Sequence, residues 1–302
     1  YLCMYLSLNA LSKCWLLYYC DWHFSFCLSV ANLMSIVILT RGRCGLSKST
    51  SHYLLAMSTA DLMVIITSVI FYRIIPAYFP SSFVSITPVC RLIMVLLTCT
   101  TAISVWLTVA FTFDRYLTIC CQNQKIKYFS GKSSGTVVAV LSVFCVVISI
   151  PWGFIVEPQY IFNNIPWGCE PKTSFYTSIS WEAFDTLNHI LTPIFPFIMI
   201  LDKNRGKSDS DPEMKNRKKS IVLLFAISTS FISLWMTYVL YSLYWRISNI
   251  YSFTDPLFIT LHSGYMLQLL SSCTNTCVYA ATQTKFREEL SKFAILPLNT
   301  PS

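Results

Sequence analysis

Apolar runs about as long as a membrane is thick alternate with short polar segments along nearly the whole chain. A helix needs about 20 mostly apolar residues to cross the hydrocarbon core of a bilayer. The connecting segments are rich in Ser, Pro, Gly, Asn and charge, which is typical of turns and loops. This pattern predicts seven membrane-spanning helices, at residues 23–40, 53–75, 88–121, 135–156, 182–201, 220–246 and 257–281.

The predicted fold is therefore an all-α membrane protein, a seven-transmembrane helix bundle with a short amphipathic C-terminal helix. We expect residues 1–22 to form an extracellular segment or to extend the first helix, 23–281 to form the bundle, and 282–302 to be cytoplasmic. In the last segment, KFREEL (285–290) alternates basic and apolar positions, so Phe286 and Leu290 are expected to dip into lipid.

Composition favours the same class of protein. The chain of 302 residues is 54% hydrophobic and 12% charged, whereas a soluble domain carries roughly a quarter charged residues. Of the 22 Lys and Arg residues, 17 lie in segments that face the cytoplasm if the N-terminus is outside. An excess of cations in inner loops sets membrane orientation and does not indicate nucleic-acid binding. We therefore expect a multi-pass plasma-membrane protein with its N-terminus outside and its C-terminus inside.

The triplet Asp114-Arg115-Tyr116 ends the third apolar run. Ionic groups are costly in hydrocarbon, so at a helix end they are expected at the water boundary. At that boundary Asp114 can form an ion pair with Arg115 in one conformation of the protein and release it in another. The triplet therefore predicts a switch at the inner face of the bundle.

Asp61 lies in the middle of the second apolar run. An ionisable residue within a span is a functional hypothesis by default, and the alternative is a structural carboxyl that is neutral or hydrogen-bonded. Because carboxylate, hydroxyl and amide oxygens suit a small hard cation, we predict a sodium-sized site at Asp61 and Ser104. Other polar residues at comparable depth in their spans are Asn32, Ser271, Ser272 and Asn275.

Two cysteines are expected on the outer side. Cys90 opens the third span, and Cys169 lies in the outer loop 157–181. Both face an oxidising compartment in the predicted orientation. A disulfide between them would tie the loop over the mouth of the bundle, and the alternative is two unpaired thiols.

The chain offers little support for catalysis. Its histidines are scattered over four regions, and no nucleophile motif, phosphate-binding glycine loop or zinc spacing is present. A transporter or channel would need polar residues along a continuous path, but Asp61 is nearly the only ionisable group at mid-membrane depth. We therefore expect no enzyme, and a transporter is kept only as an alternative.

Several motifs occur in order along the chain: Asn32, LAMSTAD ending at Asp61, Cys90, DRY at 114–116, FISLW at 231–235, NTCVY at 275–279, and Phe286. In this order and at these separations, over about residues 24–292, the chain resembles a rhodopsin-like (class A) G-protein-coupled receptor. More narrowly, ILTRGRCGLSKSTSHYLLAMSTADL and VWLTVAFTFDRYLTICCQ are similar to the orphan receptors related to the tryptophan- and phenylalanine-responsive brain receptor.

The resemblance implies a receptor that binds a small extracellular ligand, an aromatic amino acid or small peptide, and activates a heterotrimeric G protein. It implies that Asp114, Arg115, Tyr116 and Tyr279 form the G-protein switch. Trp235 would be the toggle beneath the ligand, with Phe231 below it. The same resemblance implies an allosteric sodium ion among Asp61, Ser104, Ser271 and Asn275, and the Cys90–Cys169 bridge.

Depth and helix face give six candidate ligand-binding residues. Leu97 stands where amine receptors carry an aspartate, and the seventh span has no lysine. These two features argue against a biogenic amine and against a retinal Schiff base. The six candidates are Thr98, Thr101, His189, Trp235, Tyr238 and Tyr265.

The fifth span departs from the family pattern. After Pro196 only five apolar residues precede a charged segment, and Gly206 and Pro212 break any extension. Family members usually continue this helix into the cytoplasm as a wall of the G-protein cleft. The alternative function is therefore a receptor-like membrane protein that does not couple.

Overall fold

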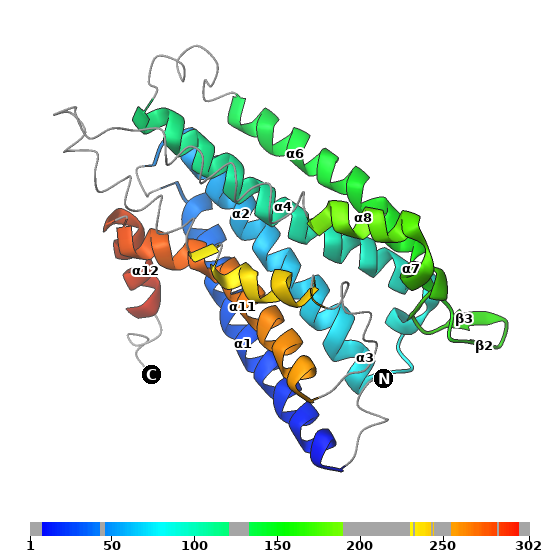
Figure 1. Ribbon diagram of the computed structural model, residues 1–302. Coiled ribbons are helices and arrows are strands. Elements are labelled where there is room, and N and C mark those ends of the chain that lie inside the picture. The colour runs from blue at the N-terminus through cyan, green and yellow to red at the C-terminus, as the bar shows by residue number, and fades with distance from the viewer. Residues whose placement is uncertain are drawn as a thin grey trace.

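The computed structural model describes residues 8–42, 46–120, 133–189, 230–231, 233–242, 244, 255–282 and 284–295. Long helices packed side by side dominate it (Figure 1). Helix α2 packs against α1 and α4, α4 packs against α6, and α1 packs against α11. The long helices are α1 (Leu8–Thr40), α2 (Lys48–Ile65), α4 (Thr87–Cys120), α6 (Ser133–Ser149) and α11 (Asp255–Thr282).

The helices agree with most of the predicted spans. Within the described residues, four stretches are long and apolar enough to cross a membrane, and they match the first four predictions. Helix α11 covers the seventh predicted span, and helical residues between 230 and 244 fall within the sixth. The four stretches are Trp22–Thr40, Lys48–Tyr78, Thr87–Arg115 and Ser134–Phe154.

Two expectations are confirmed in part. Helix α1 begins at Leu8, so residues 8–22 extend the first helix, which was one of the two expectations for residues 1–22; their extracellular position stays a prediction. Helix α8 (Ile179–His189) covers the start of the fifth predicted span. The rest of that span, with Pro196, Gly206 and Pro212, lies outside the described residues.

The turn between α1 and α2 has recognisable start and stop signals. Gly42 follows the end of α1 with a φ of +66°, a left-handed conformation that glycine adopts without a Cβ clash. Ser47 then caps α2, because its Oγ accepts a hydrogen bond of 3.3 Å from the Thr50 amide. The chain therefore reverses between Thr40 and Lys48, and α1 and α2 become neighbours.

Helix α2 continues as a π-helix, η2 (Ile66–Ile74), before the short α3 (Ile75–Tyr78). At its end the Ile75 amide donates to the Ile70 carbonyl, five residues back. Such wide turns are rare and recur at functional sites. A π-helical turn also rotates the side chains that follow it to another face of the helix. Tyr72 and Arg73 lie in such a position here.

The main apolar cluster lies at the end of the bundle that carries Asp114. Helix α12 (Thr284–Ile295) leaves the end of α11 at an angle (Figure 1) and inserts Phe286 into this cluster with none of its surface exposed. The prediction that Phe286 dips into lipid is therefore wrong. Leu290 packs against the same cluster but is only partly buried, so its contact with lipid stays a prediction. The cluster comprises Ile38, Leu39, Tyr53, Leu54, Met57, Ala60, Leu107, Phe111 and Phe286.

At the opposite end from α12 the chain forms a small β-structure (Figure 1). Strands β2 (Tyr160–Phe162) and β3 (Ile165–Trp167) form a hairpin. Its two-residue turn, Asn163-Asn164, has φ values of 49° and 61°, the left-handed conformation that tight hairpins require and that Asn tolerates. Other short elements here are η3 (Phe83–Ser85), η4 (Ile150–Phe154), β1 (Val156–Glu157), β4 (Glu170–Pro171) and α7 (Thr173–Thr177).

Phe286→Ala should lower the thermal stability of the purified protein by the equivalent of about 3–5 kcal/mol, because a fully buried ring leaves a cavity. The matched control is Phe79→Ala, since the Phe79 side chain is 65% exposed. Thermal unfolding in detergent measures both. Equal losses for the two variants would contradict the packing of α12 against the bundle.

Candidate functional site

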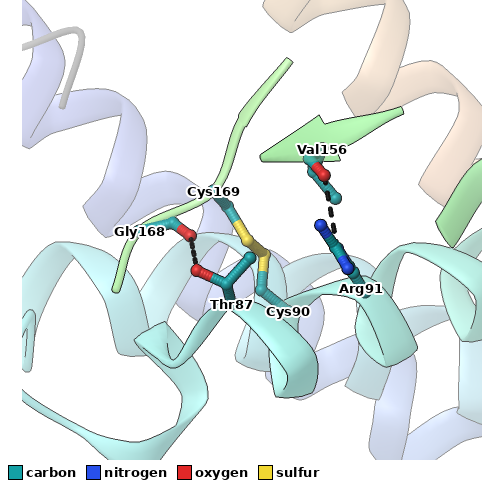
Figure 2. The surroundings of a disulfide bond; sticks show 6 residues. All are labelled: Thr87, Cys90, Arg91, Val156, Gly168 and Cys169. Carbon is teal, nitrogen blue, oxygen red and sulfur yellow. Dashed lines mark hydrogen bonds between the residues drawn. A yellow bond between two sulfur atoms is a disulfide. The ribbon is translucent and has the colours of Figure 1, made fainter. Parts of the chain in front are cut away.

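A disulfide links α4 to the loop that precedes α7. Cys90 and Cys169 are bonded, with their Cα atoms 6.3 Å apart, a normal separation for a disulfide. Figure 2 shows the bond between the helix and the loop strand. The prediction of this bridge is confirmed, and the alternative of two unpaired thiols is wrong.

Hydrogen bonds hold the loop on both sides of the disulfide (Figure 2). Thr87 Oγ1 donates to the Gly168 carbonyl at 2.8 Å, and Arg91 Nε donates to the Val156 carbonyl at 3.3 Å. The Gly168 amide donates to the Ser85 carbonyl at 2.9 Å. In addition to the covalent bond, the loop is thus fixed against α4 at two points and against Ser85, just before α4, at a third.

A cavity of about 450 Å³ lies beneath this loop. Its volume falls in the range of small-molecule sites, and its wall is mostly apolar and aromatic, as such sites are. Five of the six predicted ligand-binding residues line it, namely Thr98, Thr101, Trp235, Tyr238 and Tyr265. The sixth, His189, ends α8, and its side chain lies outside the described residues.

The cavity also has polar lining residues that the sequence analysis did not select. Arg73 and Asp185 carry opposite charges, and Asn188 and Gln268 add amide groups. Neither charged residue is among the six candidates that depth and helix face gave. The sequence does hint at the position of Arg73. Apolar residues continue after it, so Arg73 does not mark the end of its helix.

Trp235 forms the floor of the cavity. Its side chain is 5% exposed and lies against Phe231, with 5.6 Å between ring centroids, and against Val105. Its indole Nε1 donates to Ser271 Oγ at 3.0 Å, and Ser271 in turn donates to the Gln268 carbonyl at 2.6 Å. The cavity floor is therefore hydrogen-bonded to α11.

Deeper in the bundle is a layer of buried polar residues. Asp61 and Asn32 are fully buried, and Ser104 Oγ donates to Asp61 Oδ1. Asn32 Nδ2 donates to the carbonyls of Leu28 and Ser272, both at 3.1 Å. Thus Asp61 and Ser104 are brought together as predicted, while the side chain of Asn275 lies outside the described residues.

The donor set of this layer fits a small hard cation. It offers a carboxylate, a hydroxyl and an amide oxygen, the ligand chemistry such cations prefer. Two fully buried acceptors, Asn32 Oδ1 and Ser58 Oγ, have no hydrogen-bond partner in the described part of the chain. Buried oxygens of this kind are usually satisfied by a partner, water or ion.

At the far end of α4, Arg115 Nη2 forms an ion pair of 2.7 Å with Asp114 Oδ2. Asp114 is 2% exposed, whereas the Arg115 side chain is 25% exposed and its guanidinium lies 5.4 Å from the Phe111 ring centroid. Ser49 Oγ donates to the other carboxylate oxygen at 3.5 Å. The side chains of Tyr116 and Tyr279 lie outside the described residues.

A helix bundle with a disulfide-capped cavity at one end and a partly buried ion pair at the other has the organisation of a membrane receptor. The model of the family described as 7 transmembrane receptor (rhodopsin family) matches residues 31–279, which is most of the chain. The chain belongs to this family. It is an all-α, seven-helix, multi-pass plasma-membrane receptor and not an enzyme.

Gly168→Ala should lower thermal stability, because Gly168 has a φ of +86° and an added Cβ would lie 2.5 Å from Gln159 Cβ. Strain of this kind is worth about 1–3 kcal/mol. Gly135→Ala is the control, since a Cβ there meets nothing within 4 Å. If the two variants melt alike, Gly168 does not lie against Gln159 as described.

Proposed function

We propose that this receptor binds a small extracellular ligand in the disulfide-capped cavity and activates a heterotrimeric G protein at the Asp114–Arg115 end. The observation that carries this proposal is the convergence of Thr98, Thr101, Trp235, Tyr238 and Tyr265 on one cavity under the Cys90–Cys169 loop. The family supports an extracellular ligand and a G-protein partner in general terms. The excess of cations on the Asp114 side supports an N-terminus outside and a C-terminus inside.

The ligand class rests on three features. The motif phrases similar to the tryptophan- and phenylalanine-responsive receptor and its orphan relatives favour an aromatic amino acid or a small peptide. The aromatic wall of the cavity, with Trp152, Phe175, Trp235, Tyr238 and Tyr265, is compatible with such a ligand. Leu97 lines the cavity where amine receptors carry an aspartate, which argues against a biogenic amine.

The mechanism is a shift between two populated states of the bundle. Ligand favours the state in which Arg115 leaves Asp114 and the sixth helix opens, and the G protein favours the same state from the other side. Trp235 acts as the toggle, because its side chain lines the cavity and also donates a hydrogen bond to Ser271. Tyr279 moves inward in the active state.

A second candidate function is a receptor-like protein that does not couple. The charged segment soon after Pro196 favours it, because the fifth helix normally forms part of the G-protein cleft. Ligand-stimulated nucleotide exchange by this chain, and by a variant with a lengthened fifth helix, decides between the two. Exchange only in the lengthened variant would support the second candidate.

Asp114→Asn should raise basal nucleotide exchange, because the neutral amide holds Arg115 more weakly in its resting position. Arg115→Ala should abolish stimulated exchange. A reconstituted G protein and labelled GTP measure both rates, with Glu157→Gln, an exposed loop carboxylate, as the control. Normal signalling by Arg115→Ala would contradict the assigned switch.

We also propose an allosteric sodium ion at Asp61 and Ser104. Binding to the folded state should raise the melting temperature of the wild type in NaCl relative to an equal concentration of choline chloride. Asp61→Asn should remove this difference, since it removes the carboxylate charge. A wild type that melts alike in the two salts, or an Asp61→Asn variant that keeps the difference, would contradict the site.

A further inference from the structure

Gly264 lies where α11 meets the sixth helix backbone to backbone. A Cβ added at Gly264 would lie 3.1 Å from Tyr238 Cα and 3.2 Å from Tyr238 N. Turning a side chain cannot relieve such short contacts, because they are made to backbone atoms. Small residues let neighbouring helices of membrane proteins approach this closely. The glycine therefore sets the distance between α11 and the sixth helix at this level of the bundle.

Two side-chain contacts join the same two helices beside Gly264. The next residue, Tyr265, lies 5.2 Å from Tyr238 by ring centroids. Two turns further along α11, Ser271 accepts the hydrogen bond of 3.0 Å from Trp235 Nε1. Trp235 and Tyr238 both line the cavity. The sixth helix and α11 are thus held together at the level where a ligand would act.

The sixth helix carries no residue that favours a bend. Its described part is helical at 230–231 and 233–242, and residues 213–255 contain neither proline nor glycine. Sharp kinks in helices arise mostly at such residues or where the regular hydrogen bonding is broken. A stiff helix that opens at one end must rotate as a whole about a point where it is held.

The contact at Gly264 suits such a rotation. The crossing angle of two packed helices is normally fixed, because the side chains of each helix fit between those of the other. No side chain projects from α11 at Gly264, so its contact with Tyr238 does not fix the angle. The two helices can therefore change their crossing angle here while their backbones stay in contact.

The place of this contact along the sixth helix gives the rotation leverage. Trp235 lies three residues from Tyr238, whereas the predicted start of the sixth span, at residue 220, lies 18 residues away. At 1.5 Å per residue these separations are about 4.5 Å and about 27 Å. A rotation at Gly264 thus moves the end toward Asp114 about six times as far as it moves Trp235. Trp235 can stay within reach of Ser271 while that end opens.

We propose that Gly264 is a positioning residue and that its contact with Tyr238 is the pivot about which the straight sixth helix rotates when the receptor opens at the Asp114 end. This proposal rests on the proposed receptor function, in which the sixth helix opens. A ligand that displaces Trp235 or Tyr238 acts beside the pivot and thereby favours one crossing angle over the other. The leverage of the helix converts that small displacement into opening on the G-protein side.

Opening can be measured as the distance between two spin labels. The labels are carried by p-acetylphenylalanine at Lys48, an exposed residue of α2, and at Lys219, next to the predicted start of the sixth span. The full-length receptor is studied in lipid nanodiscs, alone and with excess nucleotide-free G protein. The wild type should show a short and a long distance, and the G protein should favour the long one.

Gly264→Ala should lower the ratio of long to short distances about fivefold or more, the size expected when one methyl is forced into a packed contact. The methyl would project between Tyr238 Cα, N and Cβ and fix the crossing angle. The neighbouring backbone has to give by only a few tenths of an ångström, so the variant is expected to fold. Gly135→Ala is the control and should keep the wild-type ratio, since a Cβ there meets nothing within 4 Å.

Thr237→Pro separates a pivot from simple crowding. A proline beside the contact gives the sixth helix a hinge of its own, so opening no longer requires rotation at Gly264. Adding Gly264→Ala to Thr237→Pro should then leave the distance ratio unchanged, whereas crowding alone would lower it equally in both backgrounds. Melting temperatures show that each variant is folded. Thr237→Gly, which also loosens the helix, takes the place of a proline variant that does not fold.

Three results would overturn the proposal. Gly264→Ala with the wild-type ratio contradicts the pivot alone, and so does an equal loss with and without Thr237→Pro. A wild type that shows one distance even with excess G protein does not open, and both the pivot and the proposed signalling then fall. Nucleotide exchange in the same samples separates the two claims: a receptor that opens but catalyses no exchange keeps the pivot and loses the signalling function.

Discussion

The burial of Asp61 in an apolar bundle is the constraint on which the arrangement of the helices depends. Lipid offers no hydrogen-bond partner, so a polar group at this depth must find one within the protein. Ser104 donates to Asp61 and ties α4 to α2, while Asn32 donates to the Ser272 carbonyl and ties α1 to α11. Apolar packing alone tolerates sliding of one helix along another. These bonds fix α4 against α2 and α1 against α11.

The same polar layer connects to the cavity. Trp235 donates to Ser271, Ser271 donates to the Gln268 carbonyl, and Gln268 lines the cavity beside Trp235. A ligand that contacts the indole therefore acts on a group whose hydrogen bond ends on α11. A ligand can shift the equilibrium between the resting and active states only by the difference in its affinity for the two states. The Trp235–Ser271 bond is one contact through which that difference can arise.

The sequence predicted the four membrane-length stretches found among the described residues, the disulfide and five of the residues that line the cavity, because polar residues within apolar runs are few. Thr98, Thr101, Trp235 and Tyr238 stand out for this reason. Arg73 was missed, because its direction depends on the π-helical turn of η2, which no residue pattern specifies. Phe286 was assigned to lipid because the alternation in KFREEL shows which face of α12 is apolar. It does not show whether lipid or protein covers that face. In the structure Phe286 packs into an apolar cluster formed with residues of α1, α2 and α4.

The strength of the Asp114–Arg115 pair limits what it can do alone. Arg115 is 25% exposed, so solvent screens the pair even though Asp114 is buried. A hydrogen bond between charged groups contributes about 1.5–3 kcal/mol. Moving a receptor from 99% resting to 99% active requires a change of about 5.5 kcal/mol in the free-energy difference between the two states. The pair can therefore bias the resting state but cannot define it. The remaining bias must come from other contacts, such as the polar layer around Asp61 and the packing beneath Trp235. Ligand and G protein must then act on those contacts as well as on the pair.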